Sequence, residues 1–268
     1  MKSKLLTSLF AIASGAIAVL AFSPFGYWPL VIPSLLGLYA LLDKATPKQA
    51  AWRGFGYAMG LFLPGQWWIH VSMTEFGGIP LPAAFVLLAG LCAYLSLYPT
   101  LACWLFARFF AGRHWSRWLL AFPALWLMAD WLRGWVMTGY PWLWFGYTQI
   151  DGPLKGFAPL LGVQGITLAL LLTASALWLV WQHRKPAWLL LPVALVGAAQ
   201  GLMQLNWVTR GEPVKVALVQ GNIEQSLKWD PEALVPTVRK YQDLSRENQD
   251  ADIIVWPESA IPAIEKEM

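Results

Sequence analysis

One carboxylate in this sequence has a setting that could support catalysis. Glu258 follows Trp256 and Pro257, at the end of the apolar run 253–256. Proline cannot donate to a strand ladder, so pairing stops there and Glu258 emerges just beyond the carboxyl end of a predicted strand. Open α/β sheets bind their ligands at that edge. A partly desolvated glutamate there is a candidate general base, and a plain surface glutamate at a strand end is the alternative.

The cysteines and histidines have weaker settings. Cys92 and Cys103 lie in one apolar run, separated by about 16 Å along a helix, which is too far for a disulfide. The three histidines stand in separate segments, with no Cys, Asp or Glu near them at ligand spacing: His70, His114 and His183. We therefore expect no metal site, and nothing in the sequence indicates a cofactor.

Four other polar residues interrupt or border apolar segments. Asp130 and Arg133 are three residues apart, the spacing of neighbours on a helix, so we expect them to pair with each other. Glu75 lies in a Gly-rich turn and is expected to be solvated, and His70 just before it is expected to be an interfacial polar side chain. We assign no chemistry to these four residues.

The region around Glu258 has the pattern of an α/β fold. The run 214–219 is β-branched and apolar and predicts a buried strand, and 253–256 predicts a second one. Between them, apolar residues recur at helical spacing at Leu234, Val238, Tyr241 and Leu244. Asp230 is the predicted N-cap of this helix with Pro231 behind it, although Pro236 leaves a later start open. Strand, helix, strand is the opening of an α/β sheet or sandwich.

The composition shows that this α/β region follows a segment adapted to lipid. The chain has 268 residues, 57% of them hydrophobic and 13% charged, against roughly 25% charged in soluble domains. Residues 1–205 contain 12 Lys and Arg and 4 Asp and Glu, whereas 206–268 contain 7 and 11. We predict a transmembrane helical domain over 1–205 and a water-soluble domain over 206–268. The formal charge of +4 forms no basic stripe, which argues against nucleic-acid binding.

The first 205 residues predict about seven transmembrane helices. Alternate connections hold 10 Lys and Arg on one side and only Arg133 and Lys155 on the other, so the N-terminus is predicted to be cytoplasmic and 206–268 to lie outside. A signal peptide ending near Ala16-Ile17-Ala18 is the alternative for the first run, and it leaves 206–268 outside as well. The predicted spans are 5–22, 27–42, 54–71, 83–110, 119–132, 158–181 and 187–205.

The connection 133–157 is rich in aromatic residues and punctuated by glycines. One interpretation is an interfacial belt, because amphipathic rings anchor at headgroup depth. The other is an arm on the outer face that handles lipid. The rings are Trp135, Tyr140, Trp142, Trp144, Phe145 and Tyr147.

Several short motifs, in this order, resemble the apolipoprotein N-acyltransferase family. Each is weak alone, but the order along essentially the whole chain is specific. The motifs are Ala21-Phe22-Ser23-Pro24, Trp131-Leu132-Arg133-Gly134-Trp135, Thr138-Gly139-Tyr140-Pro141-Trp142-Leu143, Gly146-Tyr147-Thr148-Gln149, Asp151-Gly152-Pro153-Leu154-Lys155-Gly156, Val219-Gln220-Gly221-Asn222-Ile223, Gln225-Ser226-Leu227-Lys228-Trp229 and Trp256-Pro257-Glu258-Ser259-Ala260-Ile261-Pro262.

The resemblance implies a multi-pass protein of the bacterial inner membrane with a periplasmic nitrilase-like αββα domain. It implies a Glu, Lys and Cys triad in which Glu258 is the general base, the cysteine carries a thioester and the lysine stabilises the oxyanion. Trp229 matches a tryptophan associated with substrate binding. The implied partners are a phospholipid acyl donor and the diacylglyceryl-cysteine of an apolipoprotein acceptor, in the membrane bilayer.

The chain reaches Met268 without the lysine and cysteine that the resemblance implies downstream of Glu258. We therefore expect it to be the N-terminal portion of such an enzyme, inactive by itself. Two strands and one helix are also too few to bury a nitrilase core, so 206–268 is expected to be poorly stabilised. The alternative is a non-enzymatic membrane anchor or a remnant lipid-binding membrane protein.

Overall fold

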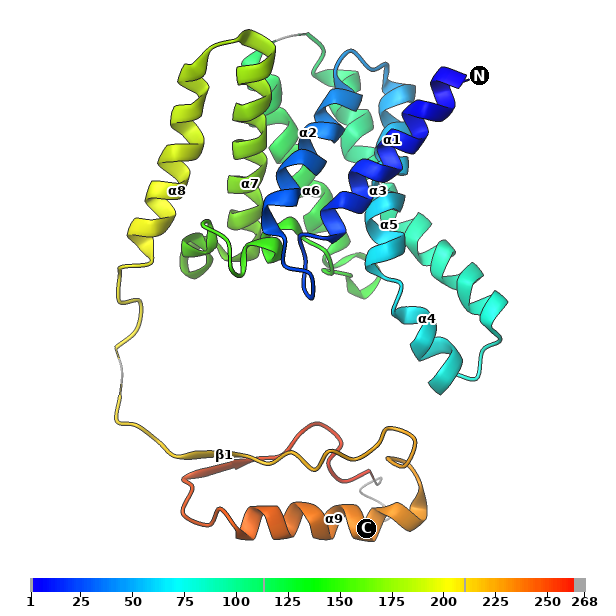
Figure 1. Ribbon diagram of the computed structural model, residues 1–268, viewed down its shortest axis with the longest axis vertical. Helices are drawn as coiled ribbons and strands as arrows, with labels where there is room; N and C mark the ends of the chain where they lie inside the picture. The colour runs from blue at the N-terminus through cyan, green and yellow to red at the C-terminus, as the bar shows by residue number, and fades with distance from the viewer. Residues whose placement is uncertain (1, 113, 210, 263–268) are drawn as a thin grey trace. The chain divides into compact units, whose positions relative to one another are not determined.

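The computed structural model describes residues 2–112, 114–209 and 211–262. The chain divides into two compact units, Met1–Trp207 and Val208–Met268, and each has its own fold (Figure 1). The first unit consists of α-helices joined by short 3₁₀ and π turns. Its helices are α1 (Lys2–Val19), α2 (Val31–Leu42), α3 (Pro47–Gly65), α4 (Ile69–Val71), α5 (Leu81–Phe109), α6 (Phe122–Arg133), α7 (Ala158–His183) and α8 (Leu190–Leu202).

Each of the seven predicted spans overlaps a different one of the longer helices, and the third also includes α4. Two segments, Leu81–Phe109 and Lys155–His183, are long and apolar enough to cross a membrane, with 29 residues and a mean hydropathy of 1.9 each. Three more apolar helices are shorter: Lys4–Val19, Trp28–Leu42 and Pro186–Leu202. Large apolar side chains such as Val86 and Leu190 are exposed on the helices, at 72% and 71%. The number of spans stays a prediction.

The helix at the third predicted span, 54–71, begins and ends earlier than that span. The helix α3 begins at Pro47, because Thr46 accepts a hydrogen bond from the backbone N–H of Gln49 and the Gln49 side chain accepts one from the N–H of Thr46. This capping box satisfies two N–H groups that have no partner within the helix. The helix ends at Gly65, one residue after Pro64, so the chain from residue 66 onward is free to turn.

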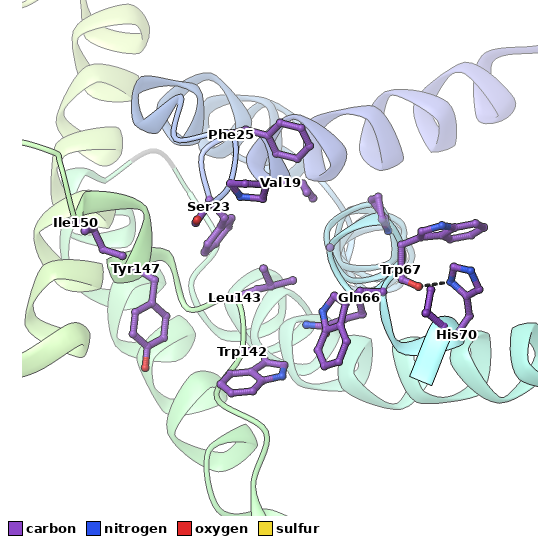
Figure 2. A pocket seen from close by; sticks show the side chains of 16 residues that line it. Val19, Ser23, Phe25, Gln66, Trp67, His70, Trp142, Leu143, Tyr147 and Ile150 are labelled. Carbon is purple, nitrogen blue, oxygen red and sulfur yellow. Dashed lines mark hydrogen bonds between the residues drawn. The ribbon is translucent and has the colours of Figure 1, made fainter. Parts of the chain in front are cut away.

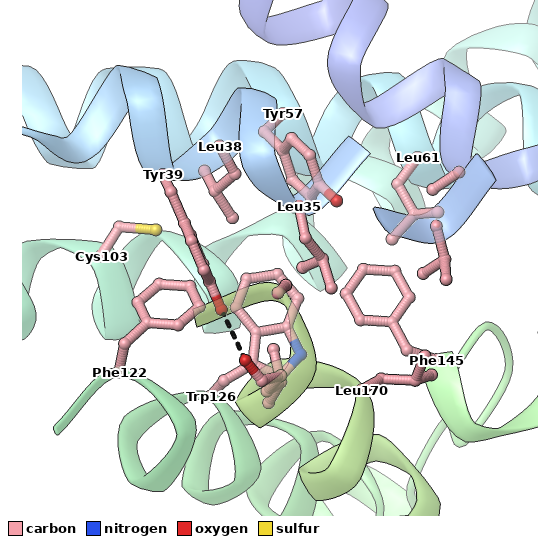
Figure 3. Close-up of a cluster of buried hydrophobic side chains, with 14 of the residues drawn as sticks. Leu35, Leu38, Tyr39, Tyr57, Leu61, Cys103, Phe122, Trp126, Phe145 and Leu170 are labelled. Carbon is pink, nitrogen blue, oxygen red and sulfur yellow. Dashed lines mark hydrogen bonds between the residues drawn. The ribbon is translucent and has the colours of Figure 1, made fainter. Parts of the chain in front are cut away.

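The core of the first unit is centred on α2. Tyr39 is fully buried, and its hydroxyl oxygen lies 3.2 Å from both Ser175 Oγ and the Leu171 carbonyl oxygen on α7 (Figure 3). Its ring lies 5.0 Å from that of Trp118 and 4.8 Å from that of Phe122, in tilted and edge-on arrangements that favour aromatic pairs. These contacts join α2 to α6 and α7.

Glycines let α1 and α3 pack with their backbones in contact. A Cβ atom on Gly15 would lie 1.9 Å from the Tyr57 carbonyl oxygen, and one on Gly60 would lie 2.1 Å from the Ile12 carbonyl oxygen. Both distances are far below a van der Waals contact. Small residues allow this approach between helices in a membrane, where packing rather than the hydrophobic effect drives association.

The second unit contains a parallel pair of strands and one helix. The strands β1 (Val216–Leu218) and β2 (Ile253–Val255) pair in the register Val216 to Ile253. The helix α9 (Pro231–Arg246) has Asp230 as N-cap, since the Asp230 side chain accepts from the N–H of Glu232 at 2.9 Å. Pro236 lies inside this helix, so the later start left open by the sequence is wrong.

The prediction that the two strands are buried is also wrong. Val216 is 44% exposed, Leu218 78% and Ile253 48%. The described part of the unit has a small core of Val219, Tyr241 and Ala260, with Trp256 packed against it. With one helix and two short strands, there are too few elements to cover both faces and both edges of the sheet.

The contact between α1 and α3 gives a stability prediction. Gly60→Ala should lower the free energy of unfolding by about 1–3 kcal/mol, because the new methyl group meets the Ile12 carbonyl and the helices must separate. Gly197→Ala is the matched control: a Cβ on Gly197 in α8 meets nothing within 4 Å, so this variant should keep or gain stability. Thermal unfolding in detergent, followed by circular dichroism, tests this. Equal melting temperatures for both variants would contradict it.

Candidate functional site

Glu258 lies on the loop that leaves β2, next to two aromatic rings that hold this loop. The Trp256 indole N–H donates to Ser245 Oγ on α9 at 2.8 Å, and the Trp256 ring lies 5.3 Å from that of Tyr241. Trp256 therefore fixes the start of the loop against the helix. Glu258 follows two residues later with an exposed side chain.

This glutamate lines a hollow of about 220 Å³ in the second unit. The Lys228 ammonium donates to the Glu258 carbonyl oxygen at 3.4 Å, a contact that the sequence did not indicate. A Cβ on Gly221 would lie 2.6 Å from the Tyr241 ring, so this turn needs a glycine. The hollow is lined by Gln220, Asn222, Ile223, Gln225, Lys228, Thr237, Tyr241, Pro257, Glu258, Ser259 and Ala260.

Trp229 is the second site residue that the sequence proposed. Its side chain is 64% exposed, and it is not among the residues lining the hollow, although Lys228 directly before it is. The described part of the chain therefore brings Glu258 together with Lys228, and leaves Trp229 on the surface.

A larger pocket of about 810 Å³ lies in the first unit. It is formed by the turn after α1, the end of α3, the residues of α4 and the segment 142–150 (Figure 2). Its lining is mostly apolar and aromatic, as is usual for sites that bind small molecules. The lining residues are Val19, Phe22, Ser23, Pro24, Phe25, Pro64, Gly65, Gln66, Trp67, Trp68, His70, Val71, Trp142, Leu143, Tyr147 and Ile150.

One buried ion pair holds the aromatic segment that forms this pocket. The Arg133 guanidinium lies 3.0 Å from Asp130 Oδ1, which confirms the predicted pair, and Arg133 is 2% exposed. The same guanidinium donates to the carbonyl oxygens of Tyr140 at 2.8 Å and Trp142 at 2.6 Å, and lies over the Phe62 ring at 5.1 Å. Charge-assisted hydrogen bonds of this kind are about twice as strong as neutral ones.

Further contacts tie the same segment to the helices on either side of it. The Tyr140 hydroxyl donates to Gln66 Oε1 at the end of α3, at 2.7 Å. The backbone N–H of Gly146 donates to Thr167 Oγ1 on α7 at 2.9 Å. The connection 133–157 is therefore a folded element of the first unit, which we call the aromatic arm.

The other polar and cysteine residues that the sequence singled out lie outside both hollows or line the larger one. Cys92 and Cys103 are free thiols buried within α5. His70 lines the larger pocket, and its Nδ1 contacts the Trp67 carbonyl oxygen, whereas Glu75 is exposed. Among residues 2–112, 114–209 and 211–262, no group of three or more His, Cys, Asp and Glu side chains could hold a metal ion.

The first unit holds two apolar helices long enough to cross a membrane and is followed by a small, charged α/β unit, an arrangement consistent with a membrane protein. Residues 14–176 match the model of the apolipoprotein N-acyltransferase N-terminal domain. The chain belongs to the apolipoprotein N-acyltransferase family.

Several relatives carry that name. The apolipoprotein N-acyltransferase of Vibrio parahaemolyticus is 51% identical over 256 residues, which cover 95% of this chain and 51% of the relative. The one of Vibrio cholerae is 47% identical over 270 residues, covering 100% and 54%. The one of Pseudomonas putida is 42% identical, covering 96% and 52%. The chain spans about half the length of the curated relatives that it matches.

The ion pair gives a second stability prediction. Arg133→Met should cost about 3–5 kcal/mol of stability, because it leaves the Asp130 carboxylate buried without its partner and releases the arm. The control is Arg246→Met, which breaks the Arg246 to Asp243 pair on the exposed face of α9, both side chains being 66% exposed. Pairs of that kind contribute about 0–1 kcal/mol. Thermal unfolding in detergent should separate the two variants, and a wild-type melting temperature for Arg133→Met would refute the assignment.

Proposed function

We propose that this chain supplies the membrane domain and the first part of the catalytic domain of a phospholipid-dependent N-acyltransferase. The reaction transfers a fatty acyl chain from a phospholipid to the α-amine of the N-terminal diacylglyceryl-cysteine of an apolipoprotein. The observation that carries this proposal is the similarity to named acyltransferases over 95–100% of the chain, and the match to the Vibrio cholerae relative, which covers 100% of the chain, includes the region of Glu258. The large apolar pocket beside the aromatic arm is consistent with lipid-anchored substrates.

In the proposed first step, Glu258 accepts the proton of a cysteine thiol. The thiolate attacks the carbonyl carbon of the phospholipid ester, and a lysine ammonium stabilises the oxyanion. The ester C–O bond then breaks, the lysophospholipid alkoxide takes the proton from Glu258, and a thioester remains. We propose that this lysine and cysteine belong to the part of the relatives that this chain does not span.

In the second step, the α-amine of the acceptor attacks the thioester carbonyl. Glu258 accepts the amine proton, the C–S bond breaks, and the thiolate takes the proton back. Glu258 therefore acts twice. The contact of Lys228 with its carbonyl oxygen supports this role, because it holds the loop while leaving the carboxylate free. Trp229, exposed next to Lys228, is proposed to contact the substrate.

The proposed layout places seven spans in the bacterial inner membrane, with the N-terminus in the cytoplasm and 206–268 in the periplasm. The charge bias between alternate connections supports this orientation. The second unit is proposed to be the beginning of a nitrilase-like αββα sandwich, whose further strands and helices would cover the exposed residues of β1 and β2. The aromatic arm is proposed to handle lipid on the periplasmic side.

The catalytic proposal is tested in a chimera in which residues 1–268 replace the matching half of the Vibrio cholerae relative. The chimera should N-acylate a diacylated lipopeptide with phospholipid as donor, detected by mass spectrometry. Glu258→Gln should lower the rate at least 100-fold, because the amide cannot accept the thiol proton. Glu232→Gln, an exposed glutamate on α9, should leave the rate unchanged. An active Glu258→Gln chimera would exclude the base role, and an inactive parent chimera would favour a non-enzymatic lipid-binding protein.

The orientation is tested by cysteine labelling in whole cells whose outer membrane has been permeabilised. Cysteine introduced at the exposed Gln242 should react with a membrane-impermeant maleimide, whereas cysteine at the exposed Lys48 should react only after lysis. Cys92 and Cys103 are fully buried and should stay silent, so the unaltered chain is the control. Labelling of the Lys48 position in intact cells would reverse the proposed topology.

A further inference from the structure

The 810 Å³ pocket of the first unit contains one polar side chain that is almost completely buried. Gln66 is 1% exposed and lies at the end of α3, where its backbone N–H donates to the Phe62 carbonyl at 2.8 Å. Figure 2 shows its side chain pointing into the pocket, toward Leu143 and Trp142 of the aromatic arm. Burying a primary amide among apolar side chains is unfavourable unless its polar atoms have partners.

The oxygen atom of the Gln66 amide has a hydrogen-bond partner in the protein. The Tyr140 hydroxyl donates to Gln66 Oε1 at 2.7 Å. Burial raises the pKa of Tyr140 to about 12, so the hydroxyl stays protonated and able to donate. This bond selects the rotamer in which the amide oxygen faces Tyr140 and the amide nitrogen faces the pocket. Within the described residues, Nε2 has no hydrogen-bond partner, and its N–H groups are available to a ligand.

The rest of the lining limits what that ligand can be. Neither lysine nor arginine is among the described residues that line the pocket, and His70 is the one basic side chain there, so a phosphate group would have no permanent counter-charge. Most of the wall is aliphatic or aromatic, which suits a long hydrocarbon chain. A ligand that combines such a chain with a hydrogen-bond acceptor, and no charge at that point, is a fatty acyl ester.

We propose that Gln66 Nε2 donates a hydrogen bond to the ester carbonyl of a diacylglycerol-based lipid whose acyl chain occupies the pocket. The identity of that lipid rests on the proposed function, which supplies two sources with the same ester group: the phospholipid donor and the diacylglyceryl group of the acceptor. Tyr140 is the positioning residue in this arrangement, since it orients the amide. Arg133 in turn holds the Tyr140 backbone through its carbonyl oxygen at 2.8 Å.

The test is a comparison of ester and ether lipids on the purified 268-residue chain. Lipid binding in detergent is measured by native mass spectrometry, with a diacyl phosphatidylglycerol against its dialkyl ether analogue, which lacks the carbonyl. The wild type should bind the ester about fivefold more tightly, the value of one neutral hydrogen bond. Gln66→Met keeps a flexible unbranched side chain but has no donor, so it should bind both lipids equally, at the affinity of the ether.

Gln204→Met, which alters an exposed glutamine, is the control and should keep the fivefold preference. Leu143→Trp adds bulk to the pocket wall and leaves the Gln66 donor in place, and it should weaken the binding of both lipids together. It tests the pocket even if Gln66→Met does not fold. An ester preference that survives in Gln66→Met, or unchanged binding in Leu143→Trp, would overturn the proposal.

A second set of binding measurements, with a diacylglyceryl-cysteine lipopeptide and its dialkyl analogue, distinguishes the two sources of the ester group. A preference that depends on Gln66 for the phospholipid alone assigns the pocket to the donor, and one for the lipopeptide alone assigns it to the acceptor. If neither set of measurements shows an ester preference that depends on Gln66, the proposed site is rejected. Because these measurements detect binding without acyl transfer, an inactive chimera would refute the proposed function and leave this result standing, and the reverse holds as well.

Discussion

The guanidinium of Arg133 is buried at the end of α6, and the aromatic arm depends on it. A buried cation needs a counter-ion and acceptors for its N–H groups, and the structure supplies both: Asp130 from the preceding turn of the helix, and carbonyl oxygens from Tyr140 and Trp142. Asp130 lies three residues before Arg133 on the same helix, so this pair needs no contact with another segment. The carbonyl oxygens of Tyr140 and Trp142 belong to the arm, and their hydrogen bonds to Arg133 hold the arm against the end of α6.

Arginine side chains also bind backbone carbonyl oxygens at the end of α2. The last carbonyls of a helix lack partners within it and carry partial negative charge. Arg53 donates to the Leu41 carbonyl at 2.5 Å, and Arg117 donates to the Leu42 carbonyl at 3.4 Å while lying over the Phe106 ring at 4.5 Å. In a unit with few charges, arginines thus fix backbone carbonyls where helices end. The interiors of the helices are held instead by aromatic packing around Tyr39 and by the close approach at Gly60.

The features that the sequence predicted correctly depend on residues that are close together in the chain. Each predicted hydrophobic run overlaps a helix, and a spacing of three residues predicted the Asp130 to Arg133 pair. The start of α3 was missed although Thr46 and Gln49 form a recognisable capping box. The burial of β1 and β2 was predicted wrongly because strand burial depends on how many other elements cover a sheet, which the residues of a strand do not encode.

The features that no local pattern could predict are those that join distant segments. Gln66 and Tyr140 are 74 residues apart, and neither is unusual in its own segment. Their contact arises because α3 stops at Gly65 while Arg133 holds the Tyr140 backbone on the same side of the unit. The arm is therefore fixed twice: its carbonyls bind a charge, and one of its hydroxyls sets the rotamer of a buried amide. A change at Arg133 acts on the pocket through Tyr140, so the rigidity of the arm and the polarity of the pocket are coupled properties.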